Sequence, residues 1–175
     1  SRWRMEAEFI MKKLAIYVHI PFCKQKCKYC DFTSFANLES EVSQYITALL
    51  REIKEYSSMA KDYIVTSVYF GGGTPSFIDE NLIDKLYNEI KHNYVLNSNA
   101  EATIEANPGT VNIEKLKRYY NIGFNRISFG VESFNKKNLD LLERDSSYDK
   151  VIELIKLCRK YGINNFKIYQ IDFIE

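Results

Sequence analysis

The run His19-Ile20-Pro21-Phe22-Cys23-Lys24-Gln25-Lys26-Cys27-Lys28-Tyr29-Cys30-Asp31-Phe32 carries three cysteines within eight residues, directly after an apolar, strand-like stretch at residues 14–20. Three thiolates this close in sequence can hold three irons of a cubane [4Fe-4S] cluster and leave the fourth iron without a protein ligand. An open iron is a place where a substrate can bind and react. The loop therefore predicts an iron-sulfur site directly after the first strand.

Two other interpretations of this loop stay open. A disulfide would leave one of the three thiols unpaired, and nothing else in the sequence suggests secretion. A structural zinc ion would need a fourth ligand, for which His19 is the only nearby candidate. The remaining cysteine, Cys158, lies in an apolar helical pattern and is predicted to belong to the core, because a buried free cysteine behaves as a small hydrophobic side chain.

The composition is that of a single domain of ordinary size. Of the 175 residues, 46% are apolar and 14% aromatic, which is enough for a substantial core. The formal net charge of +1 gives no electrostatic basis for binding nucleic acid or an anionic membrane. No apolar run approaches the ~20 residues that cross a bilayer.

The first ten residues are charged and lack the apolar region of a signal peptide. Because Met11-Lys12-Lys13 resembles a native start, we interpret residues 1–10 as a leader or tag and residues 11–175 as the domain. A reduced, cytoplasmic compartment is expected, which suits an oxygen-sensitive cluster.

Strand and helix patterns alternate along the chain. Strands are predicted at residues 14–20, 65–70, 100–106, 126–131 and 166–171, with helical patterns after each of the first four. Asp79 is expected to cap the second helix, and Gly123 and Gly162 to end later ones. The β-then-α order predicts the α/β class, with a parallel sheet and right-handed crossovers.

Every unusual polar or glycine-rich segment follows a strand. The cysteine loop follows the first strand and Gly71-Gly72-Gly73-Thr74-Pro75 the second, while Glu105 ends the third and Glu132 follows the fourth. Ligands of parallel α/β folds bind at the carboxyl ends of the strands, so these segments are expected to form one site. Taken alone, the glycines could serve only a tight turn.

Four motifs follow one another in register between residues 14 and 162. They are Tyr17-Val18-His19-Ile20-Pro21-Phe22-Cys23, Tyr69-Phe70-Gly71-Gly72-Gly73-Thr74-Pro75-Ser76, Ile104-Glu105-Ala106-Asn107-Pro108-Gly109 and Arg126-Ile127-Ser128-Phe129-Gly130-Val131-Glu132-Ser133-Phe134. Together they resemble the radical S-adenosylmethionine (SAM) superfamily and, within it, the oxygen-independent coproporphyrinogen III oxidase family. That family has a heme-chaperone branch, HemW. The oxidases typically carry a further cysteine where this chain has Phe32, and Cys30-Asp31-Phe32 is similar to the chaperone branch.

The resemblance implies a radical-SAM barrel related to the TIM barrel, with six βα units, parallel strands and helices outside. The pattern here supplies about five strands, so we interpret the chain as a partial (β/α)6 barrel that is truncated at its C-terminus. Its last strand and its inner face are expected to be apolar and exposed, which makes a homo-oligomer possible.

The resemblance also implies the ligands of two cofactors, while no catalytic side chain is assigned. Cys23, Cys27 and Cys30 would ligate the [4Fe-4S] cluster. Glu105 would bind the ribose of SAM, Tyr29 would lie near its adenine, and the glycine turn would hold its amino group. The full set of expected SAM contacts is Tyr17, Tyr29, Gly72, Gly73, Thr74, Glu105, Glu132 and Arg144.

Two positions depart from the pattern of the family. Glu132 stands where glutamine is usual, which exchanges a group that donates and accepts for an acceptor-only carboxylate. Tyr169 stands where an aspartate is expected to open an Asp-Leu-Ile-Tyr-Gly segment, and residues 172–175 resemble the start of that segment three positions later. Whether the chain is an active enzyme therefore stays open.

Three functional hypotheses follow from the resemblance and its departures. The first is a radical-SAM protein that binds and transfers heme as a chaperone. The second is a coproporphyrinogen dehydrogenase that decarboxylates propionate side chains through a 5′-deoxyadenosyl radical. The third is a non-catalytic metal-binding remnant. The expected partners are SAM and either heme or a porphyrinogen.

Overall fold

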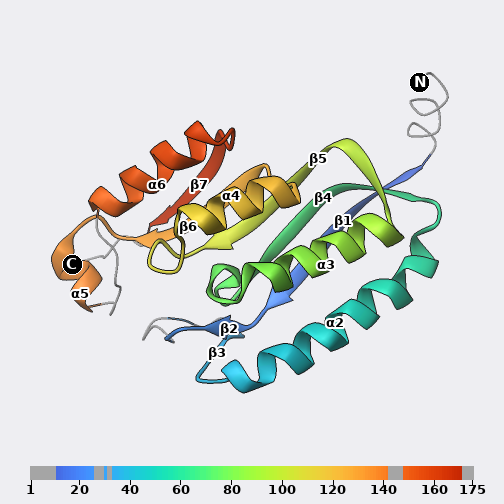
Figure 1. Cartoon of the computed structure of the whole chain (residues 1–175), viewed down its shortest axis with the longest axis horizontal. Coiled ribbons are helices and arrows are strands. Elements are labelled where there is room, and N and C mark those ends of the chain that lie inside the picture. The colour runs from blue at the N-terminus through green and yellow to red at the C-terminus, as the bar shows by residue number, and fades with distance from the viewer. Residues whose placement is uncertain (1–10, 26–29, 31–32, 142–147, 171–175) are drawn as a thin grey trace.

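The computed structural model describes residues 11–25, 30, 33–141 and 148–170, and it contains a five-stranded parallel sheet (Figure 1). The strand order is β1-β4-β5-β6-β7, so the order of these strands in the sheet is the same as their order along the chain. Their bounds are Lys12–Ile20, Tyr63–Gly72, Val95–Ala106, Arg126–Glu132 and Asn165–Gln170. This sequential order is that of a (β/α) barrel wall and confirms the predicted fold class.

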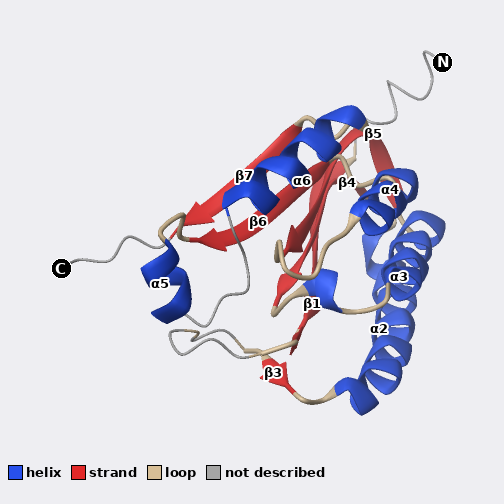
Figure 2. Cartoon of the chain, turned by 60° about the vertical axis from the view of Figure 1, so that its left-hand side comes forward, coloured by secondary structure: helices blue, strands red, loops and turns tan. Residues whose placement is uncertain are grey.

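The long helices all lie on one side of the sheet (Figure 2). The α-helices are α2 (Val42–Ser57), α3 (Glu80–Asn93), α4 (Ile113–Ile122), α5 (Lys136–Leu141) and α6 (Tyr148–Lys160). Two short strands, β2 (Phe22–Cys23) and β3 (Phe35–Ala36), pair in parallel beside the cysteine loop. Short 3-10 turns complete the fold at η1 (Glu39–Glu41), η2 (Ser58–Ala60) and η3 (Pro75–Phe77).

Alternate residues of each strand face the helices and form the core. Phe70 on β4, Ile104 on β5 and Phe129 on β6 are all fully buried. Phe70 packs edge-on against Phe124, with ring centroids 5.2 Å apart. The hydrophobic effect therefore acts mainly on one face of the sheet.

The predicted helix signals are confirmed. The Asp79 carboxylate accepts from the backbone N–H of Asn81 at 2.7 Å and caps α3. Gly123 adopts a left-handed φ of 120° after α4, and Gly162 follows α6 with a φ of 89°. The third predicted strand begins five residues early, because Val95 and Leu96 already pair with β4 before a polar stretch hides the alternation.

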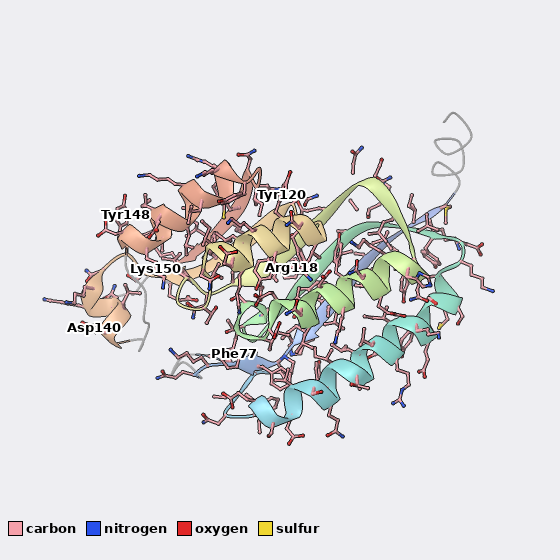
Figure 3. All side chains as sticks on the ribbon, in the orientation of Figure 1. Phe77, Arg118, Tyr120, Asp140, Tyr148 and Lys150 are labelled. Carbon is pink, nitrogen blue, oxygen red and sulfur yellow. The ribbon has the colours of Figure 1, made fainter. Side chains whose placement is uncertain are left out.

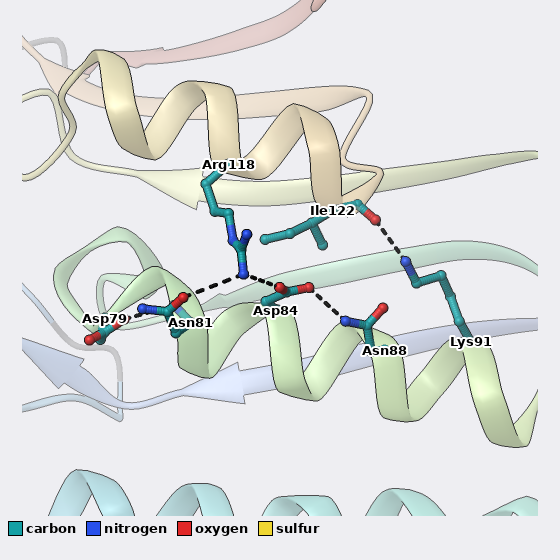
Figure 4. A network of polar contacts seen from close by, with 7 residues as sticks. All are labelled: Asp79, Asn81, Asp84, Asn88, Lys91, Arg118 and Ile122. Carbon is teal, nitrogen blue, oxygen red and sulfur yellow. Dashed lines mark hydrogen bonds and ion pairs between the residues drawn. The ribbon is translucent and has the colours of Figure 1, made fainter.

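A polar network joins the outer surfaces of α3 and α4 (Figure 4). Arg118 lies on α4 (Figure 3) and reaches toward α3, where it forms an ion pair with Asp84 (Figure 4). At the other end of the two helices, Lys91 donates to the backbone carbonyl of Ile122 at 3.0 Å. These contacts fix the helix layer behind the strands.

The expectation of an apolar inner face is wrong for the residues described, whereas in the last strand two large hydrophobic residues, Ile168 and Tyr169, are indeed exposed. In β7 only Phe166 is partly buried, and it packs toward the core, whereas Lys167 and Tyr169 alternate with it and are exposed. The described helices do not cover the inner face, so its side chains are not required to be apolar. It carries hydroxyl, carboxylate and ammonium groups. No helix in the described part of the chain is long and apolar enough to cross a membrane.

Candidate functional site

The residues predicted to bind ligands lie on the inner face, at the carboxyl ends of the strands. The strand register places His19 beside Gly71, Glu105 beside Ser128, and Gly130 beside Tyr169. In a parallel sheet these ends all lie at the same edge. The structure thus brings the cysteine loop, the glycine turn and the two strand ends into one region.

The glycine turn is fastened to the start of the cysteine loop by backbone hydrogen bonds. Gly73 N donates to Ile20 O at 2.9 Å, and Thr74 N donates to Phe22 O at 2.8 Å. A Cβ on Gly73 would lie 2.9 Å from Cys23 Sγ and equally close to two backbone atoms, so a side chain is excluded there. Thr74 Oγ1 donates to Cys23 Sγ at 3.4 Å. The turn therefore cradles the first cysteine.

The two described cysteines of the loop are free thiols, with hydroxyl groups close to the sulfur atoms. Cys23 is buried, and Cys30 is half-buried with Ser34 Oγ 3.7 Å from its sulfur. Cys27 and Tyr29 lie outside the described residues, as does Arg144. Consequently, no group of three metal-ligating side chains occurs among the residues that are described. Thiols with hydrogen-bond donors to sulfur fit an iron-sulfur cluster chemically.

His19 is fully engaged in hydrogen bonds within the protein. Its Nε2 must carry the proton, because this atom lies 2.9 Å from Thr33 O, which can only accept. Its Nδ1 then accepts from the Tyr17 hydroxyl at 3.0 Å. A Cβ on Gly72, whose φ is 118°, would meet the ring at 2.5 Å. Both ring nitrogens of the candidate zinc ligand are thus occupied in this arrangement.

Glu105 is held by two donors from β4. The Tyr69 hydroxyl donates to Oε1 at 2.6 Å, and the Gly72 backbone N–H donates to Oε2 at 3.1 Å. Burial, and then the hydrogen bond to Glu105, raise the pKa of Tyr69 well above its usual value. Each carboxylate oxygen keeps a further lone pair with which a ligand hydroxyl could pair.

Two more predicted SAM contacts lie beside this carboxylate or at the end of β6. The Tyr17 ring is 58% exposed and stacks on Tyr69, with ring centroids 6.0 Å apart. Glu132 has a left-handed φ of 68° and lies opposite Gln170. Left-handed backbone in a residue with a Cβ is uncommon and is enriched at functional positions.

Three residues of the site were not singled out from the sequence. Tyr69 orients Glu105, Ser34 lies beside Cys30, and a Cβ on Gly71 would come within 3.0 Å of Glu105 Oε2. Strand alternation could have identified Tyr69, because it lies two residues before Gly71 and so on the same face. Cys158 is fully buried in the core as predicted, and burial raises the pKa of its thiol to about 11.

The sequence is similar to one large superfamily and to two named groups of relatives. Residues 17–174 match the Radical SAM superfamily. The chain is 39% identical over 160 residues to the heme chaperone HemW of Haemophilus influenzae and 37% identical over 157 residues to that of Escherichia coli. It is 31% identical over 163 residues to the oxygen-independent coproporphyrinogen III oxidase of Salmonella typhimurium.

The solved structures agree with this similarity. Coproporphyrinogen III oxidase (HemN) from Escherichia coli matches with a TM-score of 0.86 at 28% identity, over 97% of this chain and 40% of the other. A structure titled native anSMEcpe with bound AdoMet matches with a TM-score of 0.62 at 20% identity, over 89% of this chain and 44% of the other, which shows the fold alone. The alignments to these three relatives include 89% to 93% of this chain. The chain spans only 36% to 42% of the length of the relatives.

Proposed function

The chain belongs to the radical SAM superfamily, within the family that contains HemW and the oxygen-independent coproporphyrinogen III oxidases, and from this we propose that it binds a [4Fe-4S] cluster and SAM. Cys23, Cys27 and Cys30 would hold the cluster. The glycine cradle against Cys23 Sγ is the observation that supports this most directly, because it excludes a side chain from the space beside the thiol. When bound, the cluster and SAM together supply one-electron chemistry.

The residues of the inner face are suited to hold the two halves of SAM. Gly72, Gly73 and Thr74 present backbone and hydroxyl groups for the amino acid half, while the Glu105 carboxylate accepts from the ribose hydroxyls. Tyr17 offers an exposed aromatic surface. Tyr29, Glu132 and Arg144 complete the proposed set.

We further propose that the chain is a heme-binding protein of the chaperone type. The support is its higher identity to heme chaperones, 37% to 39%, than to the oxidase, 31%. Phe32, in place of a further cysteine, points the same way. We do not assign the heme ligand to His19, because both of its ring nitrogens form hydrogen bonds within the protein, and His92 is exposed at the end of α3. A reducing, cytoplasmic compartment suits the proposed cluster.

Anaerobic reconstitution with iron and sulfide, followed by absorbance and EPR, tests the cluster. Replacing Cys23, Cys27 or Cys30 by alanine should abolish the cluster signal. The matched control is Cys158→Ala, because this cysteine is fully buried behind the sheet. Full cluster content in any of the three loop variants, or loss of the cluster in the control, would contradict the assignment.

Two measurements on the reconstituted chain separate the functions. Saturable binding in a heme titration supports the chaperone, and its absence would rule that proposal out. Production of 5′-deoxyadenosine with porphyrinogen decarboxylation would instead support the dehydrogenase, which the structural match to HemN keeps as the second candidate. A metal-binding remnant would bind metal and show neither property.

A further inference from the structure

The glycine turn is held from two sides. On one side, the backbone N–H groups of Gly73 and Thr74 donate to the cysteine loop. On the other side, Lys115 of α4 reaches the short 3-10 turn η3 that follows the glycines. Its Nζ donates to Ser76 O at 2.6 Å and to Ile78 O at 3.0 Å. We call these two hydrogen bonds the lysine clamp.

The Ser76 side chain links the same turn to the loop between β5 and α4. Ser76 is fully buried, and its Oγ accepts from the backbone N–H of Asn107 at 3.0 Å. Ser76 Oγ and Thr110 Oγ1 lie 2.6 Å apart. Thr110 Oγ1 donates its only proton to Asn107 O at 3.0 Å, so the Ser76 hydroxyl donates to Thr110. Both hydroxyl protons therefore have an acceptor, which fixes the Ser76 side chain.

The placement of Lys115 does not favour its own helix. Lys115 lies in the first turn of α4, where its backbone N–H donates to the Asn112 side chain at 2.9 Å. The positive end of the helix dipole lies there, so a cation is less favourable than an anion. Burial lowers the pKa of Lys115, while the negative charges of Glu80 and Asp79 oppose this shift. The two carbonyls of the lysine clamp compensate for these costs and hold the ammonium in place.

The lysine clamp acts on the segment that contacts Cys23. Phe77, which lies between the two clamped carbonyls, donates its backbone N–H to Thr74 O at 2.8 Å. Thr74 Oγ1 in turn donates to Cys23 Sγ at 3.4 Å. The turn is already in close contact with Cys23 at Gly73, so a released turn can only move away from the sulfur. Loss of the lysine clamp should therefore lengthen the hydrogen bond from Thr74 to sulfur.

We propose that Lys115 is a positioning residue that tunes the reduction potential of the iron-sulfur cluster through Thr74. The inference rests on the proposed function, because it requires that Cys23 ligates the cluster. A ligating cysteine is deprotonated, so its sulfur accepts the hydrogen bond from Thr74 as a thiolate. Hydrogen bonds to the sulfur atoms help to set the potential of a cluster, because they stabilise the more negative, reduced state.

Redox titration of the anaerobically reconstituted cluster, followed by EPR, tests the proposal. Lys115→Met fills most of the same space and removes the donor, so the potential should become more negative. Thr74→Val keeps the shape of the side chain and removes the hydroxyl, so it should lower the potential at least as much. Because Lys115 acts through Thr74, the double variant should show the shift of Thr74→Val alone. Lys115→Arg restores a cationic donor and should recover part of the shift.

The matched control is Lys91→Met, because Lys91 Nζ also donates to a backbone carbonyl, that of Ile122, at 3.0 Å (Figure 4). The N-terminus of α3 follows η3 closely and Lys91 lies in the last turn of α3, so this bond is remote from the glycine turn. The control should lose a similar amount of stability in urea unfolding and keep the parent potential. A parent-like potential in Lys115→Met, or the same shift in Lys91→Met, would overturn the proposal. Additive shifts in the double variant would overturn the route through Thr74.

Hydrogen exchange in the cluster-free chain tests the lysine clamp separately. The amide of Thr74 donates to the cysteine loop, and that of Asn107 donates to Ser76 Oγ. Lys115→Met should raise both exchange rates about tenfold, the factor that corresponds to one charge-assisted hydrogen bond, whereas Lys91→Met should leave both unchanged. Unchanged rates in Lys115→Met would overturn the lysine clamp. If the rates rise but the parent chain takes up no cluster, the proposed function fails, and the tuning role fails with it although the lysine clamp exists.

Discussion

The two faces of the sheet are built from the same strands and have opposite chemistry. On the helix-covered face, Phe70, Ile104 and Ile127 are fully buried and make only apolar contacts of the core. On the inner face, the Tyr69 hydroxyl donates a hydrogen bond to Glu105, and Lys167 Nζ lies 4.4 Å from the centroid of the Tyr169 ring. Neighbouring residues of one strand therefore serve different purposes, because one faces the core that stabilises the fold and the next faces the candidate ligand site.

This contrast predicts that substitutions in the glycine turn and substitutions in the core have different effects. Free energy of folding comes mainly from apolar burial, which the helix layer provides. Geometry at the candidate site depends on close backbone approach and on a few directed donors. Substitutions on the two faces should therefore affect different measurements.

The largest effect is expected at Gly73. Gly73→Ala places a Cβ 2.9 Å from Cys23 Sγ and from two backbone atoms of the cysteine loop, so the loop must move. We expect loss of most of the reconstituted cluster, measured as bound iron and sulfide per chain. Gly123→Ala is the control, because it strains a left-handed φ behind the sheet and should reduce stability while the cluster content is retained.

The second prediction compares two aromatic residues on opposite faces. Phe70→Ala removes a fully buried ring that packs on Phe124, so the free energy of unfolding should fall by about 3–5 kcal/mol. Tyr17→Ala removes a ring that is 58% exposed and should reduce it by about 1 kcal/mol or less. Urea unfolding of both variants decides this, and similar losses would remove the distinction between the faces.

The sequence predicted one face better than the other. Apolar alternation and cap residues such as Asp79 and Gly123 revealed the strands, the helices and their order, because these signals are local. The cysteine loop and the glycine turn were identified as candidate site segments for the same reason. The hydrogen bond from Tyr69 to Glu105 was not predicted, because the two residues lie on different strands and are 36 positions apart in the sequence.

The third prediction concerns two tyrosines with raised pKa values. Tyr119 on α4 is fully buried and its hydroxyl has no hydrogen-bond partner among the described residues, whereas the Tyr69 hydroxyl donates to Glu105. Tyr119→Phe removes an unpaired polar group and should stabilise the chain by about 1 kcal/mol, while Tyr69→Phe should destabilise it by a similar amount. If both substitutions change the free energy of unfolding in urea in the same direction, the comparison is contradicted.

The Tyr119 variant should also change the pH dependence of stability. Burial, and then the negative charge of Glu80, raise the pKa of Tyr119 above its unfolded value of about 10. Above pH 10 the unfolded chain therefore binds fewer protons at this residue than the folded chain, so the free energy of unfolding falls as pH rises. This part of the alkaline loss should be absent from Tyr119→Phe in unfolding curves measured on either side of pH 10.

The smallest effect is expected at Glu132, where the inner-face site contains backbone strain. Its φ of 68° disfavours any residue with a Cβ by roughly 1–2 kcal/mol, while glycine is penalised by less than about 1 kcal/mol for its freedom in the unfolded chain. Glu132→Gly should therefore be more stable than Glu132→Ala by about 0.5 kcal/mol or more. At Glu153, an exposed position inside α6, the order should reverse, with glycine about 1 kcal/mol less stable than alanine. Urea unfolding of the four variants measures both orders. If alanine is more stable than glycine at both positions, the backbone at the end of β6 is not strained, and Glu132 does not differ from the helices in this respect.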